Sequence, residues 1–250
     1  MNNLFFSFKM TPYVILFIER DGSTYLSSLL VSHPHIDAVY ERFAVMENKG
    51  ATAMEQIQWA KQYWTKSLIN KAAARGFKTK LINVLDQKLF RNLLIEKNVH
   101  IIQMQRQNTV KAVVSKINAK RLHDQSGYWN LYKETDRMPP MEIKVDDFQS
   151  LLTERENLEA ELNQFTAELP LNKMVINYEE LLSDREAVLK SLFKFLNVEY
   201  KFVESKTLKH TSDDLRDVVL NFDELKDHYK NTVYETMFEE VIQSSKAGMD

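Results

Sequence analysis

The sequence predicts an α/β protein in which a central parallel sheet of four to five strands is flanked by helices. Two observations lead to this fold class. Short runs rich in Val, Ile and Leu alternate with longer segments of helical periodicity, as in successive βαβ units. The chain has 250 residues, of which 44% are hydrophobic, so it can form one sizeable core. The same length admits two small domains, which is the less favoured alternative.

The expected strands are short, and several are rich in Val and Ile. Four of them lie at Tyr13–Ile18, Phe77–Val84, Val99–Met104 and Lys173–Tyr178, and a weaker fifth lies at Ile36–Tyr40. Helical periodicity predicts helices at Ser23–Ser32, Ala53–Ala74, Asp86–Lys97, Thr109–His123, Phe148–Glu168, Asp184–Leu196 and Ser212–Tyr229. Because helices separate the strands, the strands are expected to be parallel.

Two segments lie outside this regular pattern. Residues 1–12 are expected to form a disordered extension, so that a single domain covers residues 13–240. Residues 124–147 contain "SGYWN" and Pro139-Pro140. This second stretch is expected to be either an irregular insertion or lid over a site, or an ordinary loop.

Composition excludes several classes of function. The absence of cysteine rules out disulfides, thiolate catalysis and cysteine-ligated metals, and it fits a cytoplasmic location. No apolar run approaches the ~20 residues of a membrane span, and no signal peptide is expected. The basic residues are scattered, so no nucleic-acid partner is expected. Residues 1–125 carry 18 Lys and Arg against 9 Asp and Glu, and residues 126–250 carry 15 against 26, so an anionic ligand is expected in the first half.

The segment "FIERDGSTYL" joins the first expected strand to the first helix. Gly22 permits positive φ and close approach to a ligand, while Ser23 and Thr24 begin the helix, where free amides favour an anion. The alternative is ordinary helix capping. A Walker nucleotide loop is disfavoured, because Phe17 stands where its first glycine is needed and Ser23 stands in place of its lysine. The cation instead precedes the glycine, at Arg20.

This loop and several later motifs resemble those of a known family. Arg20-Asp21-Gly22-Ser23-Thr24 is similar to the 5′-phosphosulfate loop of sulfotransferases that use 3′-phosphoadenosine 5′-phosphosulfate (PAPS), and "LLVSHPHIDAVYERF" resembles the helix, His-Pro turn and strand that follow it. The stretch from Arg106 to Ser115 resembles the 3′-phosphate motif, and "NYEELL…FLNV" and "LKHTSDDLRDVVLNFDEL" resemble later bacterial motifs. The resemblance covers Tyr13 to Tyr234. It implies the P-loop-like sulfotransferase architecture and a reaction that requires no metal.

The resemblance also implies roles for individual residues. The cofactor-binding residues would be Arg20, Asp21, Gly22, Ser23, Thr24, Tyr25, Arg106, Ser115 and Lys209. Arg20 would also act in catalysis by neutralising the 5′-phosphosulfate, and Arg106 with Ser115 would bind the 3′-phosphate. Glu41 occupies the place of the general base, with a salt bridge to Arg42 as the alternative.

Further side chains stay open as candidates. His33 and His35 are rival bases. Lys78 and Lys80 lie on or beside a strand and are candidates for contacting an anionic acceptor, although one is expected on the exposed face of the strand. Trp129 lies in the irregular stretch and is a candidate for acceptor contact.

Asp21 departs from the family pattern, which has a small residue there. Together with Glu19 it places two carboxylates beside a dianion, so its side chain is expected to face solvent or Arg42, or else to weaken cofactor binding. Three functions therefore stay open. The first is sulfuryl transfer from PAPS to a hydroxyl of a carbohydrate, glycolipid or small metabolite. The others are a cofactor-binding protein of the same fold without turnover, and a nucleotide kinase with a degenerate loop.

Overall fold

The protein is built on a five-stranded, entirely parallel β-sheet. The computed structural model describes residues 10–65, 72–131, 133–205 and 212–242. The strand order is β2-β3-β1-β4-β5, with bounds β1 Thr11–Leu16, β2 Ile36–Val39, β3 Ala74–Thr79, β4 His100–Gln105 and β5 Lys173–Asn177. The predicted fold class is confirmed, and the weak fifth strand is present as β2.

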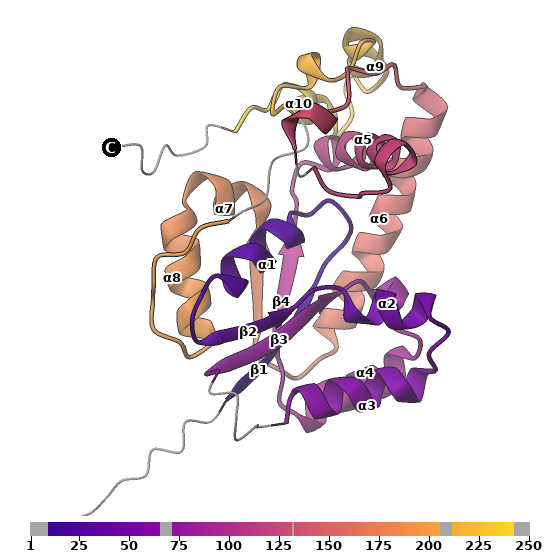
Figure 1. The fold of residues 1–250 in the computed structure, drawn as a ribbon. Helices are drawn as coiled ribbons and strands as arrows, with labels where there is room; N and C mark the ends of the chain where they lie inside the picture. Colours follow the sequence, from indigo (N-terminus) through magenta and orange to yellow (C-terminus); the bar gives the residue numbers. More distant parts are fainter. Residues whose placement is uncertain (1–9, 66–71, 132, 206–211, 243–250) are drawn as a thin grey trace, which may run out of the picture.

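Helices connect and cover the strands. They are α1 Ser23–Val31, α2 Arg42–Asn48, α3 Ala53–Tyr63, α4 Gln87–Glu96, α5 Thr109–Ser126, α6 Val145–Ala167, α7 Tyr178–Ser183, α8 Arg185–Phe195, α9 Phe222–His228 and α10 Glu235–Glu239. Short 3₁₀ turns lie at Leu81–Asn83, Glu134–Asp136 and Leu215–Asp217. Figure 1 shows α6 extending from the group formed by α5, α9 and α10 down along the sheet.

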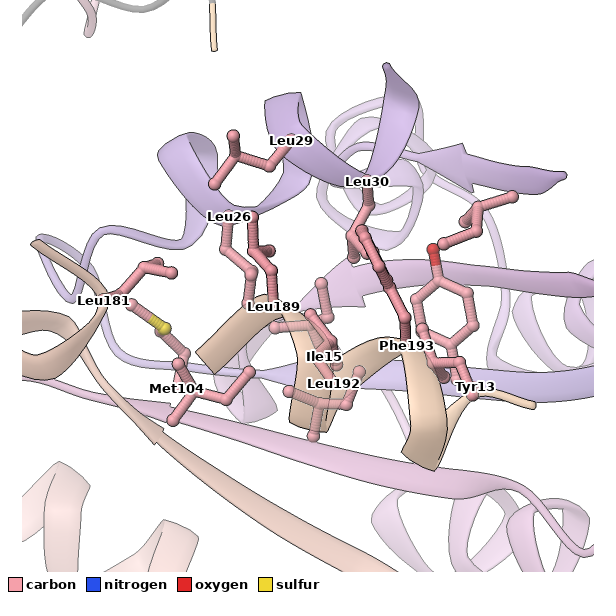
Figure 2. Packing of buried hydrophobic residues seen from close by; sticks show 14 of the residues in the cluster. Tyr13, Ile15, Leu26, Leu29, Leu30, Met104, Leu181, Leu189, Leu192 and Phe193 are labelled. Atoms are coloured by element: carbon pink, nitrogen blue, oxygen red, sulfur yellow. The ribbon is translucent and has the colours of Figure 1, made fainter. Parts of the chain in front are cut away.

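Two cores fill the two faces of the sheet, and the alternation of side chains along β1 separates them. Tyr13 and Ile15 pack against leucines of α1 and α8, together with Met104 of β4 (Figure 2). Val14 and Leu16 point to the opposite face, where they pack with residues of α2, α3, α4 and the second half of α6. Because both faces are covered, β1 is apolar throughout, as is usual for a buried parallel strand.

A third apolar cluster joins α5, the first half of α6, α9 and α10. Met141 forms a parallel bridge with Val219, and the Asn221 amide bonds both the N–H and the C=O of Ile143 at 2.9 Å. The stretch 124–147 is shorter than expected as an irregular segment, because α5 continues to Ser126 and ends at Gly127, whose φ is 77°. The bridge between Met141 and Val219 ties the segment before α6 to the segment before α9.

Several expected boundaries are wrong. The strand expected at Phe77–Val84 lies instead at Ala74–Thr79, and the following turn is held by the Gln56 side chain, which donates to the Asn83 carbonyl and accepts from the Leu85 amide. Helix α3 ends at Tyr63, residues 66–71 lie outside the described residues, and Ala74 already belongs to β3. Strand β3 thus includes Ala74, which local periodicity assigned to a helix.

The other differences lie near the ends of the domain and between long elements. The helix expected at Ser212–Tyr229 is divided, because Val219 pairs with Met141 and only α9 is α-helical there. The strand β1 begins at Thr11, so two residues that we had assigned to the N-terminal extension belong to the sheet. Helices α2 and α7 were not expected at all.

The sheet order determines where a ligand site can lie. The chain leaves β1 toward β2 on one side, whereas it leaves β4 toward β5 on the other side. In open α/β sheets the crevice at such a switch point, beyond the carboxyl ends of the strands, is the usual ligand site. Arg20, Lys78 and Arg106 lie at or just after the carboxyl ends of β1, β3 and β4, which are neighbours in the sheet.

Candidate active site

The loop after β1 has a backbone conformation that local sequence alone does not favour. Gly22 has φ 85° and Arg20 has φ 72°. A Cβ on Gly22 would lie 2.3 Å from Cδ2 of Tyr178, so this position requires glycine for space as well as for its φ. Positive φ at Arg20, which is not glycine, costs about 1–2 kcal/mol, so the surrounding structure must hold it there.

The Ser23 and Thr24 hydroxyls do not cap α1. No side chain caps this helix, and its first turn contains no acidic residue. Instead, Lys78 Nζ donates to Ser23 Oγ at 3.2 Å and to Thr24 Oγ1 at 2.8 Å. Ordinary capping is therefore not the reason for these two hydroxyls. The first amides of α1 remain uncapped by side chains, as an anion site requires.

Of the two candidate lysines, Lys78 is the one that reaches the site. It lies on an inner strand covered on both faces and is 1% exposed, so it is not on an exposed face. Its ammonium pairs with Glu41 Oε1 at 3.0 Å and lies 4.9 Å from the centre of the Phe17 ring. Burial lowers the pKa of Lys78, and the Glu41 carboxylate opposes that shift.

Glu41 lies at the site, at the start of α2. Its partner is Lys78 and not Arg42, whose guanidinium lies 6.0 Å from the centre of the Trp59 ring. The Glu41 side chain is 37% exposed, so one of its sides is open to a substrate. Because Lys78 contacts both Glu41 and the loop hydroxyls, the predicted base and the predicted anion loop are joined through one ammonium group.

The 5′ and 3′ motifs expected from the sequence also meet. Arg20 Nε donates to the buried Ser115 Oγ at 2.9 Å, and Arg106 Nη1 donates to the Arg20 carbonyl at 3.4 Å. Burial and the nearby Arg106 lower the pKa of Arg20 to about 10, and burial lowers that of Arg106 as well. Among the described residues, Arg106 Nε is buried with no hydrogen-bond partner. Two neighbouring guanidinium groups with an unused donor favour an anion.

Tyr178 and Glu179 connect these two motifs. The Tyr178 ring contacts the Gly22 position and lies 5.0 Å from the Arg106 guanidinium. The Glu179 carboxylate accepts from the amides of Gln107 and Asn108 at 3.0 and 3.2 Å and is 8% exposed. In the sequence, Tyr178 and Glu179 appeared only as part of the motif "NYEELL", and that motif did not predict these contacts.

Asp21 faces neither solvent nor Arg42. It is 1% exposed, its Oδ2 accepts from the Ile18 amide at 2.9 Å, and its Oδ1 pairs with Arg155 of α6. Burial raises the pKa of Asp21 to about 6, although Arg155 opposes the shift. Its own amide donates to the Ile18 carbonyl. Both expected orientations of Asp21 are therefore wrong, because its amide and its carboxylate are bonded within the protein, while its effect on cofactor binding stays a prediction.

The second carboxylate beside the loop is also neutralised. Glu19 pairs with Lys116 at 2.7 Å and with Lys80 at 3.3 Å. Burial alone would raise the pKa of Glu19, but these two ammonium groups outweigh it and lower the pKa. Lys80 is therefore paired within the protein and is a quarter exposed. Neither carboxylate near the loop is left to repel an anion.

The histidines and two remaining candidates lie in different places. His33 and His35 precede β2 and therefore lie at the amino edge of the parallel sheet, opposite the loop. Trp129 contributes its carbonyl, 3.4 Å from Arg20 Nη1, and its ring stacks on His123. Tyr25 is half-buried against the core, and Lys209 lies outside the described residues.

A small cavity of about 140 Å³ lies behind the loop, between the end of β4 and α6. Its lining includes Asp21, Arg106, Arg155 and Glu159. In the described ranges no group of three or more His, Asp or Glu is arranged to hold a metal ion. None of the described helices is long and apolar enough to cross a bilayer.

Comparison with known proteins identifies the family and the fold. The sulfotransferase domain family matches residues 11–249. A sulfotransferase from Alicyclobacillus acidocaldarius has a similar structure, with a TM-score of 0.50 and 15% identity over 92% of this chain and 96% of that one. Mouse sulfotransferase SULT7A1, complexed with PAP, matches with a TM-score of 0.46 and 14% identity over 86% of this chain and 66% of that one.

A search among curated proteins finds no match. The family match covers nearly the whole chain, and the bacterial structure has the same α/β fold. The chain therefore belongs to the sulfotransferase domain family and is an enzyme of that class.

Proposed function

We propose that the protein transfers a sulfuryl group from PAPS to a hydroxyl acceptor. The observation that carries this proposal is the convergence of Lys78, Ser23, Thr24 and Glu41 at the carboxyl end of the sheet. A cation, two hydroxyls and an uncapped helix start suit a phosphosulfate, and a carboxylate beside them suits a hydroxyl acceptor.

The residues present fit this cofactor. The loop from Arg20 to Tyr25 would hold the 5′-phosphosulfate, because Gly22 leaves no Cβ and the first amides of α1 have no side-chain cap. Arg106 and Ser115 would hold the 3′-phosphate, and the unpartnered Nε of Arg106 supports that role. Arg20 links the two phosphate positions through Ser115.

Sulfuryl transfer depends mainly on how the reacting groups are positioned and how the developing charge is stabilised. When bound, PAPS would supply the sulfuryl group, and its transfer would resemble that of a phosphoryl group. Lys78 and Arg20 stabilise the negative charge that develops on the leaving phosphate. Glu41 accepts the proton of the acceptor hydroxyl at its open carboxylate oxygen. Lys78, 3.0 Å from Glu41, keeps that carboxylate directed toward the loop.

The acceptor is a hydroxyl of a carbohydrate, a glycolipid or a small metabolite. The alternative of a cofactor-binding protein without turnover was motivated by Asp21. This argument for a protein without turnover is weaker, because the Asp21 carboxylate is held by Arg155 and the Ile18 amide. A nucleotide kinase is disfavoured, because the loop has no lysine after Gly22.

Calorimetry and an acceptor screen test the proposal. Adenosine 3′,5′-bisphosphate should bind the wild-type protein, and ATP with Mg²⁺ should bind much more weakly. Radiolabelled PAPS should then yield a labelled product with at least one acceptor from the three classes. Binding of ATP with Mg²⁺ in preference to the bisphosphate would reject the proposal in favour of a kinase. Tight bisphosphate binding with no product from any acceptor class would favour the protein without turnover.

A further inference from the structure

Arg155, on the long helix α6, contacts the loop on both sides of Arg20. Its Nη1 donates to the Glu19 carbonyl at 3.2 Å, and its Nη2 pairs with Asp21 Oδ1. Arg155 is 6% exposed and lies 134 residues from Asp21 in the sequence. One guanidinium therefore binds the residue before Arg20 and the residue after it.

The backbone between these two contacts is the strained part of the loop. Arg20 has φ 72°, a conformation that an L-residue other than glycine keeps only when its surroundings hold it. Asp21 closes the turn from the other side, because its carboxylate also accepts from the Ile18 amide at 2.9 Å. A fork of two donors suits this task, since a lysine ammonium lacks that planar geometry.

Close packing does not replace this ion pair. Asp21 and Arg155 both line the cavity of about 140 Å³ between β4 and α6, so this side of the loop borders a cavity and not packed apolar side chains. Glu159 lies 2.8 Å from Arg155 Nε and directs the guanidinium from its own helix. The polar contacts of Arg155 are thus what α6 supplies to this side of the loop.

We propose that Arg155 is a positioning residue, which fixes Arg20 in its left-handed conformation so that its guanidinium reaches Ser115 and the 5′-phosphate position. Asp21, the residue that departs from the family pattern, is the anchor for this arginine. The inference rests on the proposed function, because it assigns Arg20 to the 5′-phosphate of the cofactor. Arg155 itself does not contact the cofactor in this proposal.

Arg155→Met tests the inference through ligand selectivity. Its affinity for adenosine 3′,5′-bisphosphate should fall at least about tenfold, a loss that calorimetry resolves readily. Its affinity for adenosine 3′-monophosphate should fall by a clearly smaller factor, because that ligand lacks the 5′-phosphate and is affected only through the contact of Arg20 with Ser115. A merely structural role would weaken both ligands equally. Arg155→Lys should recover only part of the loss, because one ammonium cannot reproduce the planar fork.

Arg91→Met is the matched control. Arg91 pairs with Glu168. Glu168 lies at the far end of α6, about 20 Å along the helix from Arg155. This variant should bind both ligands like the wild type. If Arg155→Met does not fold, Asp21→Asn carries the same test, because it keeps the size of the anchor and removes its charge. The same selective loss is expected from it.

Two results would overturn the inference. Equal bisphosphate affinity in wild type and Arg155→Met, or an equal loss for both ligands, would mean that Arg155 does not act through Arg20. If the wild-type protein fails to bind the bisphosphate at all, the proposed function fails first and takes this inference with it. The wild-type measurement therefore separates the two failures.

Discussion

Replacing Lys78 by methionine is the sharpest test of the site, because this buried ammonium joins the loop hydroxyls to Glu41. It donates to Ser23 Oγ and Thr24 Oγ1 and pairs with Glu41. Methionine is similar in length, apolar and unbranched, so it fills the space without the charge. The change therefore removes the interactions and leaves the core of the sheet largely intact.

The expected magnitudes follow from these contacts. Loss of a charged donor to an anion costs about 1.5–3 kcal/mol, so the affinity for adenosine 3′,5′-bisphosphate should fall by roughly 10- to 150-fold. Turnover should fall further, by about 10²–10³-fold, because in the proposed mechanism Lys78 stabilises charge that grows during transfer. Stability should change little, since Glu41 is 37% exposed and water can replace the lost partner.

Calorimetry gives the bisphosphate affinity, single-turnover assays give the rate, and thermal unfolding gives the stability. Lys80→Met is the control, because Lys80 lies on the same side of the sheet end but pairs with Glu19 at 3.3 Å. The control should keep affinity and rate within about threefold of wild type. The reasoning is refuted if Lys78→Met lowers the melting temperature while affinity and rate remain those of the wild type. Lys78 would then be a structural cation only.

Four further predictions concern the remaining groups. Glu41→Gln should lower turnover at least ~100-fold in steady-state assays with nearly unchanged bisphosphate affinity, and an unchanged rate would assign the proton to another group. Arg106→Ala should weaken the bisphosphate by about 2 kcal/mol or more in calorimetry, and wild-type affinity would remove the 3′-phosphate assignment. Gly22→Ala should abolish measurable bisphosphate binding and lower the melting temperature, because its Cβ would lie 2.3 Å from the Tyr178 ring at φ 85°, and normal binding would contradict the loop geometry. His33 should make the free energy of unfolding fall as pH drops through its ordinary pKa of 6.5, because burial lowers the folded pKa and so favours the neutral ring. Denaturation of His33→Gln should show a smaller fall between about pH 7.5 and about pH 5.5, and an equal slope in both proteins would refute the assignment.

The predictable part of the site was the part that local order in the sequence encodes. Arg20, Gly22 and Arg106 each follow an apolar strand, and the carboxyl ends of parallel strands meet at one edge. Glu41 was named as the base through the resemblance to sulfotransferases, and it lies 3.0 Å from Lys78. Strand order accounts for where these residues lie, whereas their roles came from the resemblance and stay predictions.

The sequence did not decide between Lys78 and Lys80 and misplaced the Asp21 side chain, because the partners of these residues are distant in the chain. One of the two lysines was expected on an exposed face, and Lys78 is the buried one, because β3 lies inside the sheet and both of its faces are covered. Asp21 is neutralised by Arg155, 134 residues away. The expected helix at Ser212–Tyr229 failed for a similar reason, since Met141 draws Val219 into a bridge. In each case a tertiary contact overrode a local pattern.

The placement of charge shows how an acidic chain gathers three cations at one edge of its sheet. The three inner strands β1, β3 and β4 lead to Arg20, Lys78 and Arg106, and the sheet order makes these strands neighbours. Three cations gathered in a low-dielectric region repel one another, which the lowered pKa of Arg20 reflects through burial and Arg106. Asp21, Glu41 and Glu179 lie among them as buried or half-buried carboxylates. Each of these carboxylates is occupied by a protein donor, namely Arg155, Lys78 or the amides of Gln107 and Asn108. The negative charges thus hold the cations and the backbone in position, and among the described residues Arg106 Nε remains a buried donor that the proposed 3′-phosphate would use.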